Sequence, residues 1–172
     1  ADNELTTLDL SKTPAIVSLN LQGNKLTSLD LHSLVALSML NVKLNKLESL
    51  NLSGLNALKN LIASDNPTLT TLDASTLTNL SSIRADNCAL ERVSLPASIT
   101  EFYAKGNKLT TLGEGAISFP KLLRLRLPNN QITEFTVGEC PLLNDLELDG
   151  NKLTSLTIGS LPALKTLYIQ KN

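Results

Sequence analysis

Residues 143–153 read LNDLELDGNKL, a pattern of the form L-x-x-L-x-L-x-x-N-x-L. The L-x-L part alternates with a period of two, which is typical of a β-strand that points one side chain inward and the next outward. The asparagine that follows can both donate and accept hydrogen bonds, so it can satisfy backbone groups where the chain turns off the strand. The stretch therefore predicts a short strand followed by a tight turn.

The same pattern recurs along the whole chain. With Ile, Val, Ala or Phe allowed at the leucine positions, it begins at residues 16, 37, 58, 80, 99, 122, 143 and 164. The asparagine position recurs at Asn3, Asn24, Asn45, Asn66, Cys88, Asn107, Asn130, Asn151 and Asn172, at intervals of 21, 21, 21, 22, 19, 23, 21 and 21 residues. Units this short cannot bury their own leucines, so they must stack, with parallel strands about 4.8 Å apart. We predict one repeat array over residues 1–172, with about eight strands that start near those eight positions.

The second half of each repeat is expected to be extended. A further L-x-x-L-x-L follows the asparagine, as in residues 26–31, 47–52 and 153–158. Prolines at positions 14, 96, 120, 141 and 162 stand just before the next strand, where they would break a helix. The return path is therefore predicted to hold little or no helix.

The chain resembles the leucine-rich-repeat family over essentially its whole length. More narrowly, it is similar to the subclass with nested 21-residue repeats, L-x-x-L-x-L-x-x-N-x-L-x-x-L-D-L, a signature carried by residues 29–31 (LDL) and 72–74 (LDA). The resemblance implies a curved right-handed solenoid with a concave parallel sheet and an extended convex side. Members of the subclass include bacterial surface proteins related to internalins, and similar arrays form the ectodomains of microbial receptor kinases. The resemblance says little about the ligand.

Composition narrows the classes of function. The chain has fifteen basic and sixteen acidic residues, so its charges nearly cancel. This balance argues against a protein that binds nucleic acids or anionic membranes. No apolar stretch approaches the roughly 20 residues that span a bilayer, so no direct membrane insertion of this segment is expected. The sequence offers no phosphate loop, nucleophile motif or metal-spaced Cys/His set, so we expect no enzyme, no catalytic residue and no cofactor.

The chain ends, the sequons and the cysteines give information on the full-length protein and on its cellular location. The chain ends on Asn172 in mid-repeat and shows no polar caps, so we expect a fragment of a longer protein. Two sequons, at Asn51 and Asn79, favour a secreted or cell-surface location. Cys88 and Cys140 lie more than two repeats apart, beyond disulfide reach, and are predicted to be free thiols. Free thiols favour a reducing compartment, so a cytoplasmic location is the alternative.

The register identifies the side chains that face outward from the strands. The row between the two strand leucines holds Arg84, Tyr103, Arg126 and Tyr168, and Arg and Tyr are enriched at binding hot spots. The alternative is that strand faces simply tolerate these residues. We predict a partner-binding face over the C-terminal half of the chain. Its residues are Arg84, Tyr103, Lys105, Arg126, Glu147, Asp149 and Tyr168.

Acidic residues on the same face allow two interpretations. Asp145, Glu147 and Asp149 lie in line and could hold a hard cation. An ion-pair ladder with basic residues on adjacent strands is the favoured interpretation, so we expect no metal. The expected pairs are Arg124 with Asp145, Arg126 with Glu147, Glu101 with Arg124, and Asp86 with Lys105.

Three further positions depart from the repeat or stand alone. Cys88 replaces a ladder asparagine and is interpreted as a structural substitute rather than a reactive thiol. Phe102, with Phe119, is expected to fill the volume left where inner positions shrink to alanine. His32 is expected to be a solvated residue with no catalytic partner, including no carboxylate placed to act with it.

The sequence therefore favours a recognition module that binds a protein or peptide through its concave face. The alternatives are a structural or assembly spacer, and the ligand-binding ectodomain of a larger receptor such as a receptor kinase.

Overall fold

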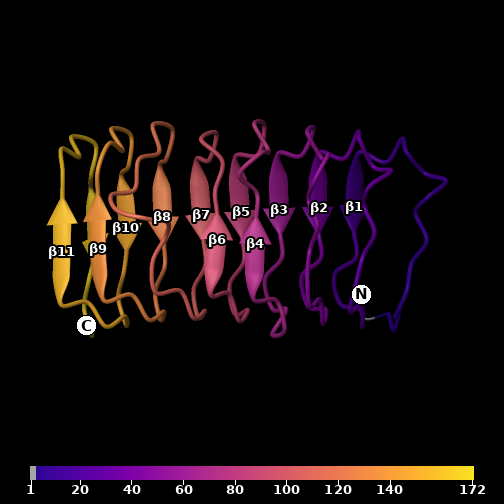
Figure 1. The fold of residues 1–172 in the computed structure, drawn as a ribbon, viewed down its shortest axis with the longest axis horizontal. Helices are drawn as coiled ribbons and strands as arrows, with labels where there is room; N and C mark the ends of the chain where they lie inside the picture. Colours follow the sequence, from indigo (N-terminus) through magenta and orange to yellow (C-terminus); the bar gives the residue numbers. More distant parts are fainter. Residues whose placement is uncertain (1–2) are drawn as a thin grey trace.

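The computed structural model describes residues 3–172 as a stack of coils along one long axis, with the two termini toward opposite ends (Figure 1). These residues form twelve short strands and no helix. The strands are β1 (Ser18–Asn20), β2 (Met39–Asn41), β3 (Asn60–Ile62), β4 (Thr71–Asp73), β5 (Ser82–Arg84), β6 (Arg92–Ser94), β7 (Glu101–Tyr103), β8 (Arg124–Arg126), β9 (Glu134–Val137), β10 (Asp145–Glu147), β11 (Ser155–Ile158) and β12 (Thr166–Tyr168).

Eight strands form one parallel sheet, the main sheet, in the order β1-β2-β3-β5-β7-β8-β10-β12. Each begins two residues after the motif start identified in the sequence. The middle residues of the strands pair with one another, as in Leu19 with Leu40 and Leu125 with Leu146. The solenoid, its parallel sheet and the stacking register are confirmed.

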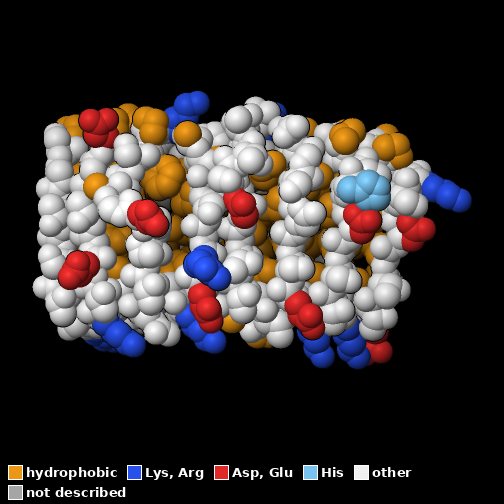
Figure 2. All heavy atoms as spheres, viewed as in Figure 1, with side chains coloured by type: hydrophobic (Ala, Val, Ile, Leu, Met, Phe, Trp, Pro, Cys, Tyr) orange, Lys and Arg blue, Asp and Glu red, His pale blue; other side chains and the backbone are white. Residues whose placement is uncertain are grey.

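The return side of each coil is extended, as predicted, and part of it is more regular than the sequence suggested. β4 pairs with β6, and β9 with β11, as two separate parallel sheets. These four strands face the main sheet across the core (Figure 1). Charged side chains of both signs are spread over the return side, and Lys and Arg side chains gather along one edge of it (Figure 2).

The core between the two sides is made mostly of leucine. The inward residues of the central strands, such as Leu61, Leu125 and Leu146, are buried. Phe102 is completely buried and belongs to the same core cluster as the small inner residues Ala85 and Ala104. Phe119 packs against the same core but is only partly buried.

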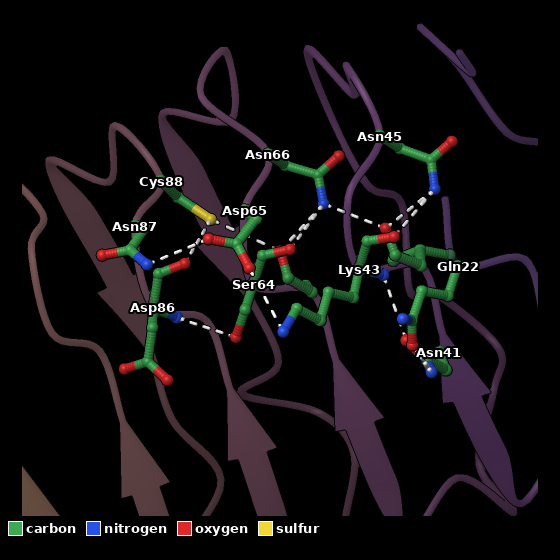
Figure 3. A network of polar contacts seen from close by, with 12 residues as sticks. Gln22, Asn41, Lys43, Asn45, Ser64, Asp65, Asn66, Asp86, Asn87 and Cys88 are labelled. Carbon is green, nitrogen blue, oxygen red and sulfur yellow. Dashed lines mark hydrogen bonds and ion pairs between the residues drawn. The ribbon is translucent and has the colours of Figure 1, made fainter. Parts of the chain in front are cut away.

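The asparagines form the expected ladder along one edge of the stack (Figure 3). Asn66, for example, accepts a hydrogen bond from the Leu47 N–H at 3.1 Å and donates to the carbonyls of Val42 and Ala63. The ladder asparagines of the inner coils each satisfy backbone groups from two successive coils, which would otherwise be buried unpaired. These asparagines are Asn45, Asn66, Asn107, Asn130 and Asn151.

Cys88 takes the place of one ladder residue, as predicted. Its thiol donates to the Ala63 carbonyl at 3.4 Å, as the asparagine amides donate to equivalent carbonyls. An asparagine here would also accept from the N–H of Leu69, but that N–H donates to the Asn66 carbonyl at 3.0 Å. The one-residue insertion at 66–69 creates that turn, so this coil needs no side-chain acceptor.

Candidate functional site

The main-sheet face is the surface formed by the outward side chains of the eight main-sheet strands and of the residues just after them. It carries a shallow hollow of about 330 Å³ over β5, β7, β8 and β10. Seven residues line the hollow: Arg84, Asp86, Tyr103, Lys105, Arg126, Pro128 and Glu147.

Five of the seven residues predicted for partner binding meet at this hollow. Asp149 and Tyr168 do not line it, although both follow from the same outward register. Asp86 and Pro128 line it but were not among the predicted site residues. Their signal was present in the sequence, since they belong to the same outward column as Lys105 and Asp149, two residues after the last residue of each strand.

Tyr103 is held between two guanidinium groups. The Cζ atom of Arg84 lies 4.7 Å from the centre of the Tyr103 ring, and that of Arg126 lies 5.6 Å from it. The three residues sit side by side because β5, β7 and β8 pair in register. A cation over an aromatic face is attracted by the ring quadrupole, so the three side chains restrict one another.

Arg126 is also fixed by two carboxylates. Its Nε lies 2.9 Å from Oδ2 of Asp145 and 3.1 Å from Oε1 of Glu147. The hydrogen bond to Asp145 raises the pKa of Arg126 above its ordinary value, and burial raises the pKa of Glu147, an effect that Arg126 opposes. The other carboxylate oxygen of Asp145 is buried with no hydrogen-bond partner.

The predicted ion-pair ladder is partly wrong. Arg126 pairs with Glu147 and Arg124 with Glu101, as expected. Asp145, however, pairs diagonally with Arg126 and not with Arg124, which lies directly opposite it. The long guanidinium of Arg126 reaches back to a carboxylate that is almost completely buried, whereas Arg124 turns toward the other neighbouring strand.

The expected pair between Asp86 and Lys105 is also wrong. Asp86 Oδ1 accepts a hydrogen bond from the backbone N–H of Lys105 at 2.8 Å, so the carboxylate contacts the chain and not the ammonium. A pair that the sequence did not suggest joins Lys43 to Asp65 at 3.4 Å. In residues 3–172, Arg84, Lys105 and Asp149 take part in no ion pair.

No group of three or more His, Cys, Asp or Glu side chains in residues 3–172 is arranged to hold a metal ion. Of the carboxylates considered for a cation, Asp145 and Glu147 both bind Arg126. Across the described residues there is also no helix with the length and apolarity to cross a membrane.

The remaining reactive side chains lie away from the hollow. Both cysteines are free thiols, as predicted, and burial raises the pKa of Cys88 to about 11. His32 is exposed, as expected, but the expectation that no carboxylate stands beside it is wrong. Its Nδ1 lies 2.7 Å from Oδ1 of Asp30, because the turn after Leu31 folds the two residues together.

The sequence matches no protein-family model and no curated protein. Among solved structures, the functional domain of InlJ from Listeria monocytogenes, described as including a cysteine ladder, is similar to this chain. The likeness has 30% sequence identity and a TM-score of 0.80, and it covers 88% of this chain and 34% of the InlJ chain. In this chain Cys88 stands in a column that is otherwise asparagine.

Two more distant structures are also similar. YopM from Yersinia enterocolitica WA-314 has 23% identity and a TM-score of 0.51, over 98% of this chain and 45% of that one, which supports the fold alone. The TLR13–ssRNA13 complex, at 20% identity and a TM-score of 0.48 over 95% of this chain and 38% of that one, is too dissimilar to inform on this protein. The chain therefore spans less than half the length of each of these structures.

A stack of repeats of about 21 residues that shares its parallel sheet and its overall fold with InlJ has the fold of a leucine-rich-repeat solenoid, and this chain is similar to the proteins of that kind.

Proposed function

We propose that this protein is a recognition module that binds a protein or peptide through the hollow on its main-sheet face. The observation that carries the proposal is the Tyr103 ring, clamped between Arg84 and Arg126 where the hollow forms. Arg and Tyr dominate binding hot spots because they combine a large contact area with directed polar groups. Side chains that are already restrained lose little conformational entropy when a partner binds.

A structural likeness supports the general role. The likeness to the leucine-rich-repeat structure of InlJ favours a protein-binding function. Solenoids of this kind present extended surfaces that suit macromolecular partners. We also propose an extracellular or cell-surface location, supported by the likeness to InlJ and by the two sequons, whose asparagines Asn51 and Asn79 are both exposed.

Alanine substitutions test the proposed face. A peptide would be selected from a displayed random library on the wild-type protein, and its dissociation constant measured by calorimetry against variants. We expect Tyr103→Ala to weaken binding by about 2 kcal/mol, the usual size of a hot-spot loss, with a smaller loss for Arg84→Ala. These two positions are preferred to Arg126, whose removal would leave the buried Asp145 carboxylate without its partner.

The matched control removes side chains from the return side. Arg92→Ala, Lys108→Ala and Glu134→Ala change exposed residues there and should leave the affinity unchanged. Thermal unfolding of every variant checks that the fold is kept. Equal affinities for the wild type and Tyr103→Ala would show that the face is assigned wrongly. A structural spacer would instead lose function when whole repeats are deleted, and its function would not change with these substitutions.

A further inference from the structure

Positive charge is left unpaired on one side of the hollow. Of its acidic lining residues, Glu147 is paired with Arg126. Asp86 forms no ion pair among the described residues and accepts a hydrogen bond from the neutral Lys105 N–H, so one carboxylate stands against the two free cations Arg84 and Lys105. Arg84 and Lys105 both line the hollow and have no ion-pair partner in the part of the chain that the structure describes. Both side chains are exposed and accessible to a partner.

The two cations are placed to act on one group. Arg84 lies directly opposite Tyr103 on the adjacent strand, and Lys105 follows Tyr103 by two residues on the same face. Strands about 4.8 Å apart and a rise of about 3.3 Å per residue place such diagonal positions about 8 Å apart at the backbone, within reach of long side chains. The Tyr103 ring holds the Arg84 guanidinium from one side, which orients its planar fork for a carboxylate.

Negative charge is left unpaired at the other end of the same face. Asp149 follows β10, is partly exposed, and pairs with no cation among residues 3–172. From β5 to β10 there are three strand-to-strand steps, through β7 and β8. At about 4.8 Å a step this is roughly 14 Å, which an extended segment crosses in about four residues. Residues four apart in an extended segment point to the same side.

We propose that the partner presents an extended segment whose acidic side chain binds Arg84 and Lys105 and whose basic side chain, four residues away, faces Asp149. This rests on the proposed function, since it names the chemistry of the partner at the same hollow. A nucleic acid fits less well because its backbone carries uniform negative charge, and the acidic residues Glu147 and Asp149 share the face with the cations.

Selection from a displayed random peptide library tests the proposal. Three proteins are used: the wild type, the double variant R84E/K105E, and the matched double variant R92E/K108E with the same change of charge on the return side. We expect peptides selected on the wild type and on R92E/K108E to carry an acidic and a basic residue four apart. R84E/K105E should bind those peptides about tenfold or more weakly. Replacing the peptide's acidic residue by lysine should restore affinity for R84E/K105E.

The outcomes separate this inference from the proposed function. Peptides that depend on Tyr103 but show no acidic preference would overturn the inference and leave the proposed function standing. Peptides unaffected by both Tyr103→Ala and R84E/K105E would overturn the proposed function itself. Saturable binding of a single-stranded oligonucleotide at physiological salt, if it were lost in R84E/K105E, would overturn the inference, because the partner at this hollow would then be a nucleic acid. Circular dichroism melts confirm that the variants fold.

Discussion

At the scale of the residue, the asparagine ladder shows what a single side chain must supply. Asn66 is fully buried and satisfies one N–H and two carbonyl groups of the backbone. Cys88 supplies only a donor, and this is sufficient because the Leu69 N–H already donates to the Asn66 carbonyl. The sequence predicted that a cysteine could stand there. It could not give the reason, which depends on the turn made by the inserted residue.

This account predicts opposite results for two ladder substitutions. Asn66→Ala should lower the free energy of unfolding by about 2–4 kcal/mol, because it leaves buried backbone groups unpaired. Cys88→Asn should not stabilise the protein, since the new side-chain oxygen would find no free donor. Urea denaturation measures both. If Cys88→Asn raised the free energy of unfolding by about 1 kcal/mol, the account would be wrong, because the cysteine would then leave a backbone donor unsatisfied that an asparagine could satisfy.

The thiol of Cys88 should be unreactive in the folded protein. Burial raises its pKa to about 11 from an ordinary value of 9.0, so at pH 8 its thiolate is about 100-fold scarcer than that of a free cysteine. Alkylation by iodoacetamide should be correspondingly slow until the chain is denatured. A native rate equal to the denatured rate would contradict the raised pKa of this partly buried thiol.

The same shift links Cys88 to stability. Below pH 9 the thiol is protonated in both states and contributes no pH dependence. As the pH rises from 9 toward 11, the unfolded chain loses this proton and the folded chain keeps it. The contribution of this group to the free energy of unfolding therefore falls over that window.

At the scale of the element, the period of two fixed the strands and their register but not their side-chain partners. The sequence predicted the register that places Arg84, Tyr103 and Arg126 in one row, and the strand pairing confirms this. The sequence did not predict the ion pair between Arg126 and Asp145. A long guanidinium can reach either the opposite or the diagonal carboxylate, and which of them it contacts depends on how deeply each is buried. The sequence also did not predict that the return segments pair as β4 with β6 and β9 with β11, because every repeat carries a similar return pattern.

The inward column of the main sheet can be tested with matched leucines. Leu125→Ala should lower the free energy of unfolding by about 2–5 kcal/mol, because Leu125 is completely buried and its loss leaves a cavity. Leu142→Ala provides the control, since Leu142 is 48% exposed and its truncation should cost about 0.5 kcal/mol or less. Equal shifts of the denaturation midpoint for the two variants would refute the inward assignment.

At the scale of the whole molecule, stacking turns a one-dimensional pattern into a surface. Residues 19–23 positions apart in the chain become neighbours, so Arg84, Tyr103 and Arg126 form one cluster. The sequence could predict the members of this row because the register repeats. It could not predict that Arg84 and Lys105 stay unpaired while Arg126 is bound, which depends on side-chain reach and burial in three dimensions.

The location of a bound peptide tests the central claim most directly. Backbone amide chemical shifts of the isotope-labelled protein would be followed by NMR while a library-selected peptide is added. The account predicts that the largest changes map to Arg84, Tyr103, Lys105 and Arg126 on the main-sheet face. Changes confined to the return strands β4, β6, β9 and β11 would contradict it.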